Sequence, residues 1–326
     1  MLLCLLLLAA LASPDGKLKV TVEPRGADLV YSATLDGKPV VEPSTVAFGP
    51  WEGILEGRRQ KVRSAWKPVY GERAEIPDRY NALTLAAPTR EIELRVFDEG
   101  FAFRYRLKGS GPFQLSGEKT EVRFPKGAEA FEEHGPEGEY ALVPVEAIKR
   151  GCERPLTVRA AADRWVSVAE AAATDYPRTL FSPTGGGGLV TETAGPIGGS
   201  LPFTTPWRVF VIGRRPCDLP ERNYLVLNLS EPQRIEDTSW IKPGKVIREV
   251  TLSTRGGRRA VDFAAAQGLQ YVEYDAGWYG HEYDDASDAR QVSPDPKRIA
   301  SIPDHGGLDL PEVIRYAKER GVGIIL

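Results

Sequence analysis

The spacing of the apolar residues changes near residue 239, and this change constrains the fold more than any other feature of the chain. Before it, short runs alternate apolar and polar residues and end at Gly, Asp or Pro; the clearest are residues 17–22, 28–35, 91–97 and 101–107. Alternation with period two, punctuated by turn residues, is typical of antiparallel strands joined in hairpins. Repeated this often, it predicts a β-sandwich over residues 13–238, with no convincing helix in that part.

The part of the chain that begins at residue 239 has a different pattern. Residues 247–252, 269–275 and 322–326 are short apolar runs typical of strands. Residues 258–267 and 310–320 carry apolar side chains at helical spacing, and each run ends near a glycine, which commonly terminates a helix. The order β-α-β-α-β predicts parallel strands joined by helical crossovers. Both a Rossmann-like sheet and a (β/α)8 barrel begin in this way.

Charge and glycine spacing argue against two classes of ligand. The chain has 42 basic and 45 acidic residues, a formal net charge of -3, and no basic run that would follow a phosphate backbone, so nucleic acid is not an expected partner. The glycine-rich residues 185–188 and 254–257 lack the GxGxxG and GxxxxGK[ST] spacings of nucleotide-binding loops. We expect both segments to be flexible turns.

The third predicted strand of the second part reaches Leu326 without a following loop or cap. A strand that ends there would leave an unpaired edge and apolar faces exposed. We therefore expect a truncated barrel, of which only the first three strands and two helices are present.

The first twelve residues, MLLCLLLLAALA, form an apolar run that ends in the small-x-small pattern read by signal peptidase. A membrane-spanning helix needs about 20 apolar residues, so we expect a signal peptide over residues 1–12 and a secreted or periplasmic protein. No Lys or Arg precedes the run, and Cys4 leaves a lipid anchor as an alternative. No later segment is long and apolar enough to span a bilayer.

Removal of this peptide would leave two cysteines, Cys152 and Cys217. An oxidising compartment would permit them to pair, but we expect two buried thiols. The chain has no CxxC motif or Cys/His cluster, so a structural zinc site is not expected.

Several motifs resemble those of glycoside hydrolase family 97, and their order and spacing match over most of the mature chain. They are TPWRVFVIG at residues 205–213, EDTSWIKPGK at 236–245, VDFA at 261–264, YDAGWY at 274–279 and, less specifically, AEAAATDYP at 169–177. The resemblance implies a galactose-mutarotase-like β-sandwich, or supersandwich, followed by a (β/α)8 TIM barrel. It also implies an α-glucosidase or α-galactosidase that uses calcium.

Asp275 and Trp278 are the candidate sugar-binding residues of the second part. Asp275 follows the second predicted barrel strand, and barrel active sites are built at the carboxyl ends of the strands. A carboxylate there can accept hydrogen bonds from sugar hydroxyls, and an indole face suits the apolar side of a pyranose ring. As alternatives, Asp275 could cap the next helix and Trp278 could simply pack.

The acidic loop FEEHGPEGEY at residues 131–140 is the candidate calcium site, because calcium prefers several oxygen ligands. The resemblance implies that the sandwich donates one Glu to a calcium ion otherwise held by barrel residues. Glu137 is the best match and Glu139 the next. His134 stands where relatives often have Asn and is a poorer calcium ligand. The loop could instead be only a solvated acidic segment.

Glu170 follows the alternating residues 165–168, and the resemblance implies that it reaches substrate from the sandwich. An exposed strand glutamate is the alternative. The loop after Trp278 holds more polar residues, which could face the substrate or only the solvent: His281, Glu282, Asp284 and Asp285.

Glycosidases hydrolyse their substrates with two carboxyl groups. In the family these come from later barrel strands, and both inverting and retaining members exist, so no catalytic residue is assigned in this chain. Residues 246–252 also depart from the Trp-rich strand of many members, which leaves the sugar preference open. We expect the N-terminal, by itself inactive, part of a secreted exo-acting α-glycosidase that acts on an oligosaccharide or glycoside. The alternative is a secreted, non-catalytic carbohydrate-binding β-sandwich with a degenerate barrel.

Overall fold

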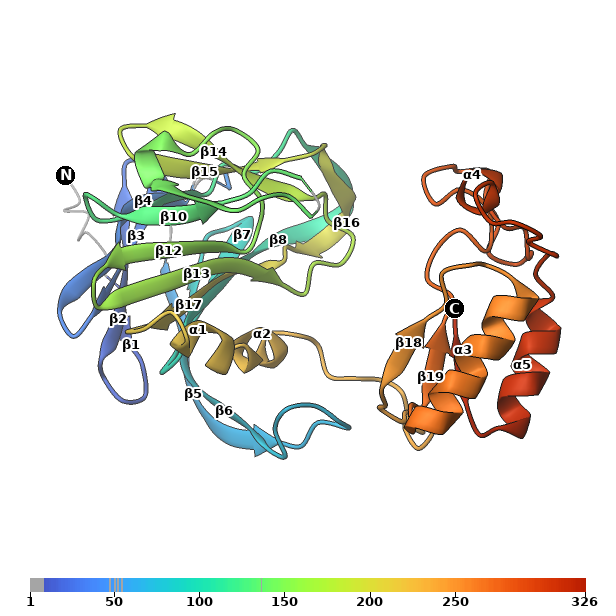
Figure 1. The fold of residues 1–326 in the computed structure, drawn as a ribbon. Helices are drawn as coiled ribbons and strands as arrows, with labels where there is room; N and C mark the ends of the chain where they lie inside the picture. Colours follow the sequence, from blue (N-terminus) through green and yellow to red (C-terminus); the bar gives the residue numbers. More distant parts are fainter. Residues whose placement is uncertain (1–8, 47, 50, 52, 54, 136) are drawn as a thin grey trace, which may run out of the picture. The chain divides into compact units, whose positions relative to one another are not determined.

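The computed structural model describes residues 9–46, 48, 49, 51, 53, 55–135 and 137–326. The chain divides into two compact units, Met1–Arg234 and Ile235–Leu326. The division lies close to residue 239, where the spacing of apolar residues changes. Each unit is described below by itself (Figure 1).

The first unit contains a seven-stranded antiparallel sheet and a ten-stranded one. The seven-stranded sheet has the order β1 (Ala9–Ala12), β2 (Leu18–Arg25), β3 (Asp28–Leu35), β4 (Lys38–Val46), β9 (Glu121–Arg123), β15 (Gly188–Thr193) and β14 (Thr179–Gly185). The other has the order β11 (Ala141–Pro144), β10 (Glu129–Glu132), β12 (Leu156–Ala161), β13 (Arg164–Ala171), β17 (Trp207–Gly213), β8 (Gly100–Leu115), β7 (Arg90–Phe97), β6 (Ile76–Ala86) and β5 (Leu55–Trp66), with β16 (Ile197–Thr204) paired to β8. The predicted β-sandwich is confirmed.

One apolar core lies between the two sheets, and strand alternation explains how it forms. Val166 and Val168 on β13 point into it, as do Phe210 and Ile212 on the neighbouring β17. The intervening residues point to the opposite face of the ten-stranded sheet and join a second, smaller cluster. Burying the apolar side chains of both sheets supplies the main favourable free energy for folding of this unit.

Two short helices cover that second face, although the sequence predicts no convincing helix before residue 239. They are α1 (Asp218–Glu221) and α2 (Tyr224–Asn228). Their buried Leu219 and Leu225 pack in the same cluster as Trp207 of β17. The prediction was wrong here because a helix of one turn is too short to repeat an apolar spacing. A 3₁₀ turn, η1 (Val145–Ala147), escaped the prediction for the same reason.

The second unit has the predicted order β-α-β-α-β, with one additional short helix before the second predicted helix. Its parallel sheet runs β18 (Val246–Arg248), β19 (Tyr271–Glu273) and β20 (Gly323–Ile325), and its helices are α3 (Thr254–Gln267), α4 (Pro296–Ile299) and α5 (Leu310–Glu319). Ser253 caps α3 through Gly256 N–H, and Gly268 ends that helix with φ 67°. The described residues contain three parallel strands with helices and no full barrel, so the (β/α)8 barrel stays a prediction.

Residues 9–12 of the predicted signal peptide form strand β1, which pairs with β2. Residues 1–8 lie outside the described part, and the signal peptide over residues 1–12 stays a prediction. No helix among the described residues has the length and apolar character needed to cross a bilayer. Cys152 and Cys217 are both free thiols, but only Cys152 is buried, so the expectation of two buried thiols was wrong for Cys217.

Gly100 allows β8 and β17 to approach closely at the centre of the ten-stranded sheet. A Cβ atom at this position would collide with the carbonyl oxygen of Phe210 and approach the side chain of Leu225. Gly195, in contrast, has no positive φ, and a Cβ atom there would have no neighbouring atom within 4 Å. The two glycines therefore form a matched pair for testing this packing.

We expect Gly100→Ala to lower the free energy of unfolding by about 1–3 kcal/mol, the usual cost of overpacking, because backbone of β17 must move. Gly195→Ala should change it by less than about 0.5 kcal/mol. Urea unfolding followed by circular dichroism measures both values. Equal effects of the two substitutions would contradict the packing described here.

Candidate functional site

In the second unit, Asp275 lies just beyond β19, at the carboxyl edge of the parallel sheet. Its Oδ2 is 2.6 Å from Nη2 of Arg248, which ends the neighbouring strand β18, and the two side chains are 50% and 48% exposed. The side chains that cap the following helices belong to Asp295 and Asp309, so Asp275 is not their cap. It is a half-exposed carboxylate at the edge where α/β folds bind ligands.

Trp278 is only 6% exposed and belongs to the apolar core of the second unit. Its ring meets the ring of Tyr279 edge-on, with 5.2 Å between centroids. Its indole Nε1 is buried and has no hydrogen-bond partner among the described residues. The structure thus gives Trp278 a packing role, and its role as a sugar platform stays a prediction.

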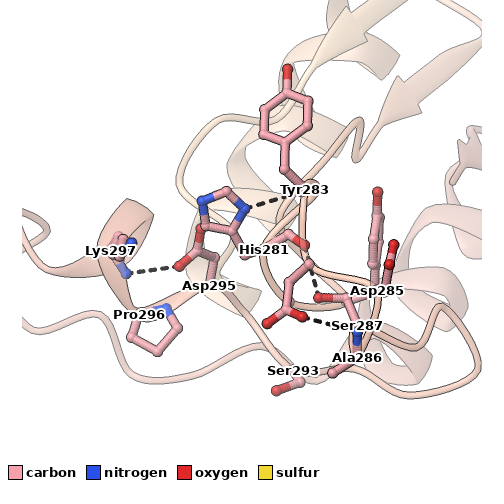
Figure 2. A pocket seen from close by; sticks show the side chains of 12 residues that line it. His281, Tyr283, Asp285, Ala286, Ser287, Ser293, Asp295, Pro296 and Lys297 are labelled. Carbon is pink, nitrogen blue, oxygen red and sulfur yellow. Dashed lines mark hydrogen bonds between the residues drawn. The ribbon is translucent and has the colours of Figure 1, made fainter.

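The loop after Trp278 borders an open hollow of about 840 Å³, which polar and apolar side chains line together, Asp285 among them (Figure 2). Two of the loop's polar side chains bond to the loop's own backbone. Nδ1 of His281 accepts from Tyr283 N–H at 3.1 Å, and Asp284 Oδ1 accepts from Ala286 N–H at 2.9 Å. Nearby, Glu282 pairs with Arg298 at 2.6 Å. These contacts hold the loop in shape.

In the sandwich unit, two glutamates at the acidic loop between β10 and β11 bond to other residues of the same loop. Glu132 is buried and lies 3.2 Å from Nε2 of His134. Glu133 accepts a hydrogen bond from Gly138 N–H at 3.0 Å. These contacts of Glu132 and Glu133 stabilise the loop.

Glu137 and Glu139 of the same loop are exposed, and Glu137 has a left-handed backbone with φ 58°. Calcium requires six to eight oxygen ligands. Among the described residues, no three His, Cys, Asp or Glu side chains lie close enough together to hold a metal ion. The residues of this loop do not form a calcium cage by themselves, and Glu137 as a calcium ligand stays a prediction.

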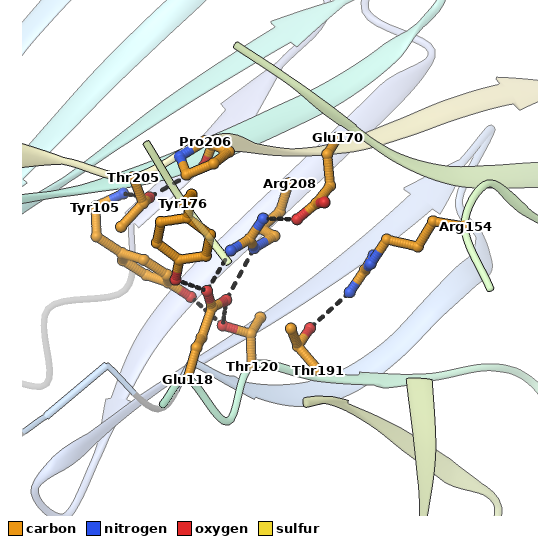
Figure 3. Close-up of polar contacts among 10 residues, drawn as sticks. All are labelled: Tyr105, Glu118, Thr120, Arg154, Glu170, Tyr176, Thr191, Thr205, Pro206 and Arg208. Atoms are coloured by element: carbon orange, nitrogen blue, oxygen red, sulfur yellow. Dashed lines mark hydrogen bonds and ion pairs between the residues drawn. The ribbon is translucent and has the colours of Figure 1, made fainter. Parts of the chain in front are cut away.

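Near Glu170, the interior face of the sandwich changes from apolar to charged. On β17 the core residues Ile212 and Phe210 are followed on the same face by Arg208, and on β13 the core residue Val168 is followed by Glu170. The antiparallel register places Glu170 directly opposite Arg208. Strand alternation alone thus brings the two charges together (Figure 3).

Arg208 is also joined to Glu118 in a buried ion pair, with the side chains 2% and 0% exposed. Nε of Arg208 donates to Oε1 of Glu118 at 2.9 Å, and Nη2 donates to Oε2. Thr120 Oγ1 donates to the same carboxylate, and Tyr176 O–H donates to it at 2.6 Å. A buried pair is stable only when such additional bonds satisfy its charges.

Burial alone would raise the pKa of Glu118, but the Arg208 charge and the hydrogen-bond donors hold it below its usual value. Burial likewise opposes the charge on Arg208, yet its carboxylate neighbours raise the pKa of the guanidinium. Burial lowers the pKa of the neighbouring Arg154 to about 10, which still leaves it protonated at neutral pH. The cluster therefore keeps its charges inside the sandwich.

Glu170 is the member of this cluster that reaches the surface. Its side chain is 18% exposed, and its Oε1 accepts a hydrogen bond from Nη1 of Arg208. Its Oε2 makes no hydrogen bond within the described part of the chain. Arg154 lies on the other side, with Nη2 donating to Thr191 Oγ1 at 2.8 Å. Glu170 is thus a held, half-buried carboxylate and not a freely exposed strand residue.

Sequence reasoning missed the rest of this cluster. Arg208 lies inside the motif TPWRVFVIG, where it is the one charged residue of the continuously buried strand β17. That was a usable signal, because a charge in such a strand needs a partner. Glu118 is 90 residues away in sequence and follows Ser116 and Gly117 in a segment without regular spacing, so nothing marked it as the partner.

We expect Glu118→Gln to lower the free energy of unfolding at pH 7 by about 3–5 kcal/mol, because Arg208 then loses its buried counter-charge. The pKa of Glu118 is lowered in the folded state, so its stabilisation is present above the unfolded pKa of about 4.3 and is lost as the pH falls through the folded value. The difference between the variant and the wild type should therefore narrow in acid.

Urea unfolding at pH 7, 4 and 2.5 measures this difference. Glu129→Gln is the control, since it removes a partly exposed ion pair with Arg159 and should cost less than about 1 kcal/mol. If the free energies of unfolding of Glu118→Gln and the wild type differed by the same amount at every pH, this would contradict the ionised state of this carboxylate.

Comparison with known proteins places these observations in a family. The sequence profile of glycosyl-hydrolase 97 N-terminal domains matches residues 11–232. A retaining alpha-galactosidase of Bacteroides thetaiotaomicron is 28% identical over 97% of this chain and 55% of its own length. A probable retaining alpha-galactosidase of Streptomyces bingchenggensis is 29% identical over 97% of this chain and 51% of its own length. The chain thus spans about half the length of these relatives.

Among solved structures, a glycoside hydrolase family 97 enzyme from Pseudoalteromonas sp. strain K8, in complex with acarbose, shares the fold. Its TM-score is 0.82 at 24% identity, over 97% of this chain and 53% of that one. The profile match covers most of the sandwich unit, including Glu118, Glu170 and Arg208. It confirms the resemblance given by the sequence motifs: the chain belongs to glycosyl hydrolase family 97.

Proposed function

We propose that this chain is the N-terminal part of a secreted or periplasmic, exo-acting α-glycosidase that removes α-linked galactose or glucose from oligosaccharides. The observation that carries the proposal is the family profile over residues 11–232. The alpha-galactosidase names of the relatives support galactose, and the acarbose complex of the Pseudoalteromonas enzyme supports an α-glycoside of glucose. The proposed signal peptide, residues 1–12, would direct export.

In this proposal the three parallel strands of the second unit are the first three of a (β/α)8 barrel. The βα order and the position of Asp275 beyond β19 support this interpretation, because barrel enzymes bind substrate at the carboxyl ends of their strands. Asp275 would accept hydrogen bonds from sugar hydroxyls, and Arg248 would hold its carboxylate in place. Trp278 would contribute mainly by packing under this edge.

Bond cleavage would require two carboxyl groups supplied by later strands of the barrel. One would protonate the leaving glycosidic oxygen, and the other would act as nucleophile or as base toward water. The present chain would supply sugar-binding residues, Asp275 from the barrel and Glu170 from the sandwich. Alone it would hydrolyse nothing.

Calcium enters the proposal through Glu137. A single exposed carboxylate cannot hold calcium, so the remaining oxygen ligands would have to come from barrel residues outside this chain. Bound calcium would supply positive charge beside the substrate. Glu132 and Glu133 would keep the loop in shape without contacting the ion.

The complete polypeptide that contains this chain should hydrolyse p-nitrophenyl α-galactoside or α-glucoside and leave the β-galactoside intact. Release of p-nitrophenol measures the rates. EDTA should lower the rate and added Ca²⁺ should restore it. A protein that binds the sugars without hydrolysing them would favour the non-catalytic alternative, and a rate unaffected by EDTA would remove the role given to Glu137.

In the same protein, Asp275→Asn should lower kcat/KM about 10- to 100-fold, the usual effect of losing hydrogen bonds to a charged group. Its stability should change by less than about 1 kcal/mol, because the pair with Arg248 is half exposed. Asp262→Asn is the matched control, since Asp262 also pairs with an arginine of the second unit, Arg320. Equal activity of the two variants would contradict the role of Asp275.

A further inference from the structure

The two oxygens of Glu170 have different surroundings. Oε1 accepts a hydrogen bond from the buried Arg208, whereas Oε2 makes none within the described residues. The side chain is 18% exposed, so the free oxygen is accessible at the end of the sandwich interior. A carboxylate held in this way is ready to accept a hydrogen bond from an incoming donor.

Arg208 has little freedom to move. Its Nε and Nη2 are committed to Glu118, and only Nη1 is directed to Glu170. Glu118 is in turn fixed by donors from Thr120 and Tyr176. The planar guanidinium therefore transmits a fixed orientation from a fully buried carboxylate to a partly exposed one.

The second arginine near Glu170, Arg154, does not orient the Glu170 carboxylate. Arg154 donates to Thr191, and its guanidinium lies over the ring of Phe181, 3.7 Å from the centroid. It adds positive charge at a distance from Glu170 without a hydrogen bond to it. Among the described residues, only Arg208 sets the direction of the Glu170 carboxylate.

We propose that Arg208 is a positioning residue: held by Glu118, it orients Glu170 so that the free Oε2 accepts a hydrogen bond from a sugar hydroxyl of the substrate. This inference rests on the substrate contact proposed for Glu170. A merely structural Arg208 would affect stability alone. A positioning Arg208 also affects sugar affinity, but only in a protein that keeps the Glu170 carboxylate.

The test is a double-mutant cycle on the complete polypeptide, with D-galactose and D-glucose affinities measured by isothermal titration calorimetry. Glu170→Gln and Arg208→Lys should each weaken binding about tenfold, the effect of losing or misdirecting one hydrogen bond to a charged group. The double variant should bind no more weakly than Glu170→Gln, because Arg208 then has no charge left to orient.

Two further variants keep the test decisive. Arg159→Lys is the matched control, since Arg159 also pairs with a glutamate on the ten-stranded sheet, Glu129. The sugar affinity of this variant should stay within about twofold of that of the wild type. Tyr176→Phe removes one donor from Glu118 and leaves both charges, so it serves if Arg208→Lys does not fold. It should weaken binding less than tenfold, and again only when Glu170 is present.

Additive effects of the two substitutions would overturn the inference, as would a folded Arg208→Lys that loses thermal stability but binds sugar like the wild type. Failure of the proposed function is distinguishable, because the wild type would then bind sugar without hydrolysing an α-glycoside while the coupling persisted. A wild type that binds neither sugar would overturn both.

Discussion

The buried ion pair between Arg208 and Glu118 is the interaction on which the charged end of the sandwich interior depends. Two charges with 2% and 0% exposure are tolerated only because each is paired and further hydrogen-bonded. Because these bonds satisfy both charges, the interior can change from apolar at Phe210 to charged at Arg208 within a single strand. It also fixes Glu170, the member of the cluster that reaches solvent.

The two units present their candidate residues by different devices. In the sandwich, strand alternation and register place Glu170 beside Arg208, and buried bonds hold both. In the second unit, Asp275 stands at the carboxyl edge of parallel strands and is held by a half-exposed pair with Arg248. The buried bonds of the sandwich contribute to its stability and also hold the candidate residue Glu170, whereas the half-exposed pair of the second unit contributes little to stability. Both present carboxylates that suit sugar hydroxyls.

Local patterns in the sequence predicted much of the fold. Alternation identified β2, β3 and β7, and the helical spacing before Gly268 identified α3. That helix begins at Thr254, so the expectation of a flexible turn at residues 254–257 was wrong. The prediction missed this first turn because Gly256 and Gly257 interrupt its apolar spacing. Contacts between residues far apart in the sequence could not be predicted from these local patterns.

Glu118 and Arg208 are 90 residues apart in sequence, so no local pattern could pair them. The burial of Trp278 depends on side chains from several elements that pack around it, and the motif YDAGWY alone does not reveal it.

The central claim is best tested by a crystal structure of the complete polypeptide with D-galactose or D-glucose bound. The account predicts Glu170 Oε2 within hydrogen-bond distance of a sugar hydroxyl, with Oε1 still bonded to Arg208. A sugar bound away from Glu170, or a Glu170 carboxylate released from Arg208, would contradict it.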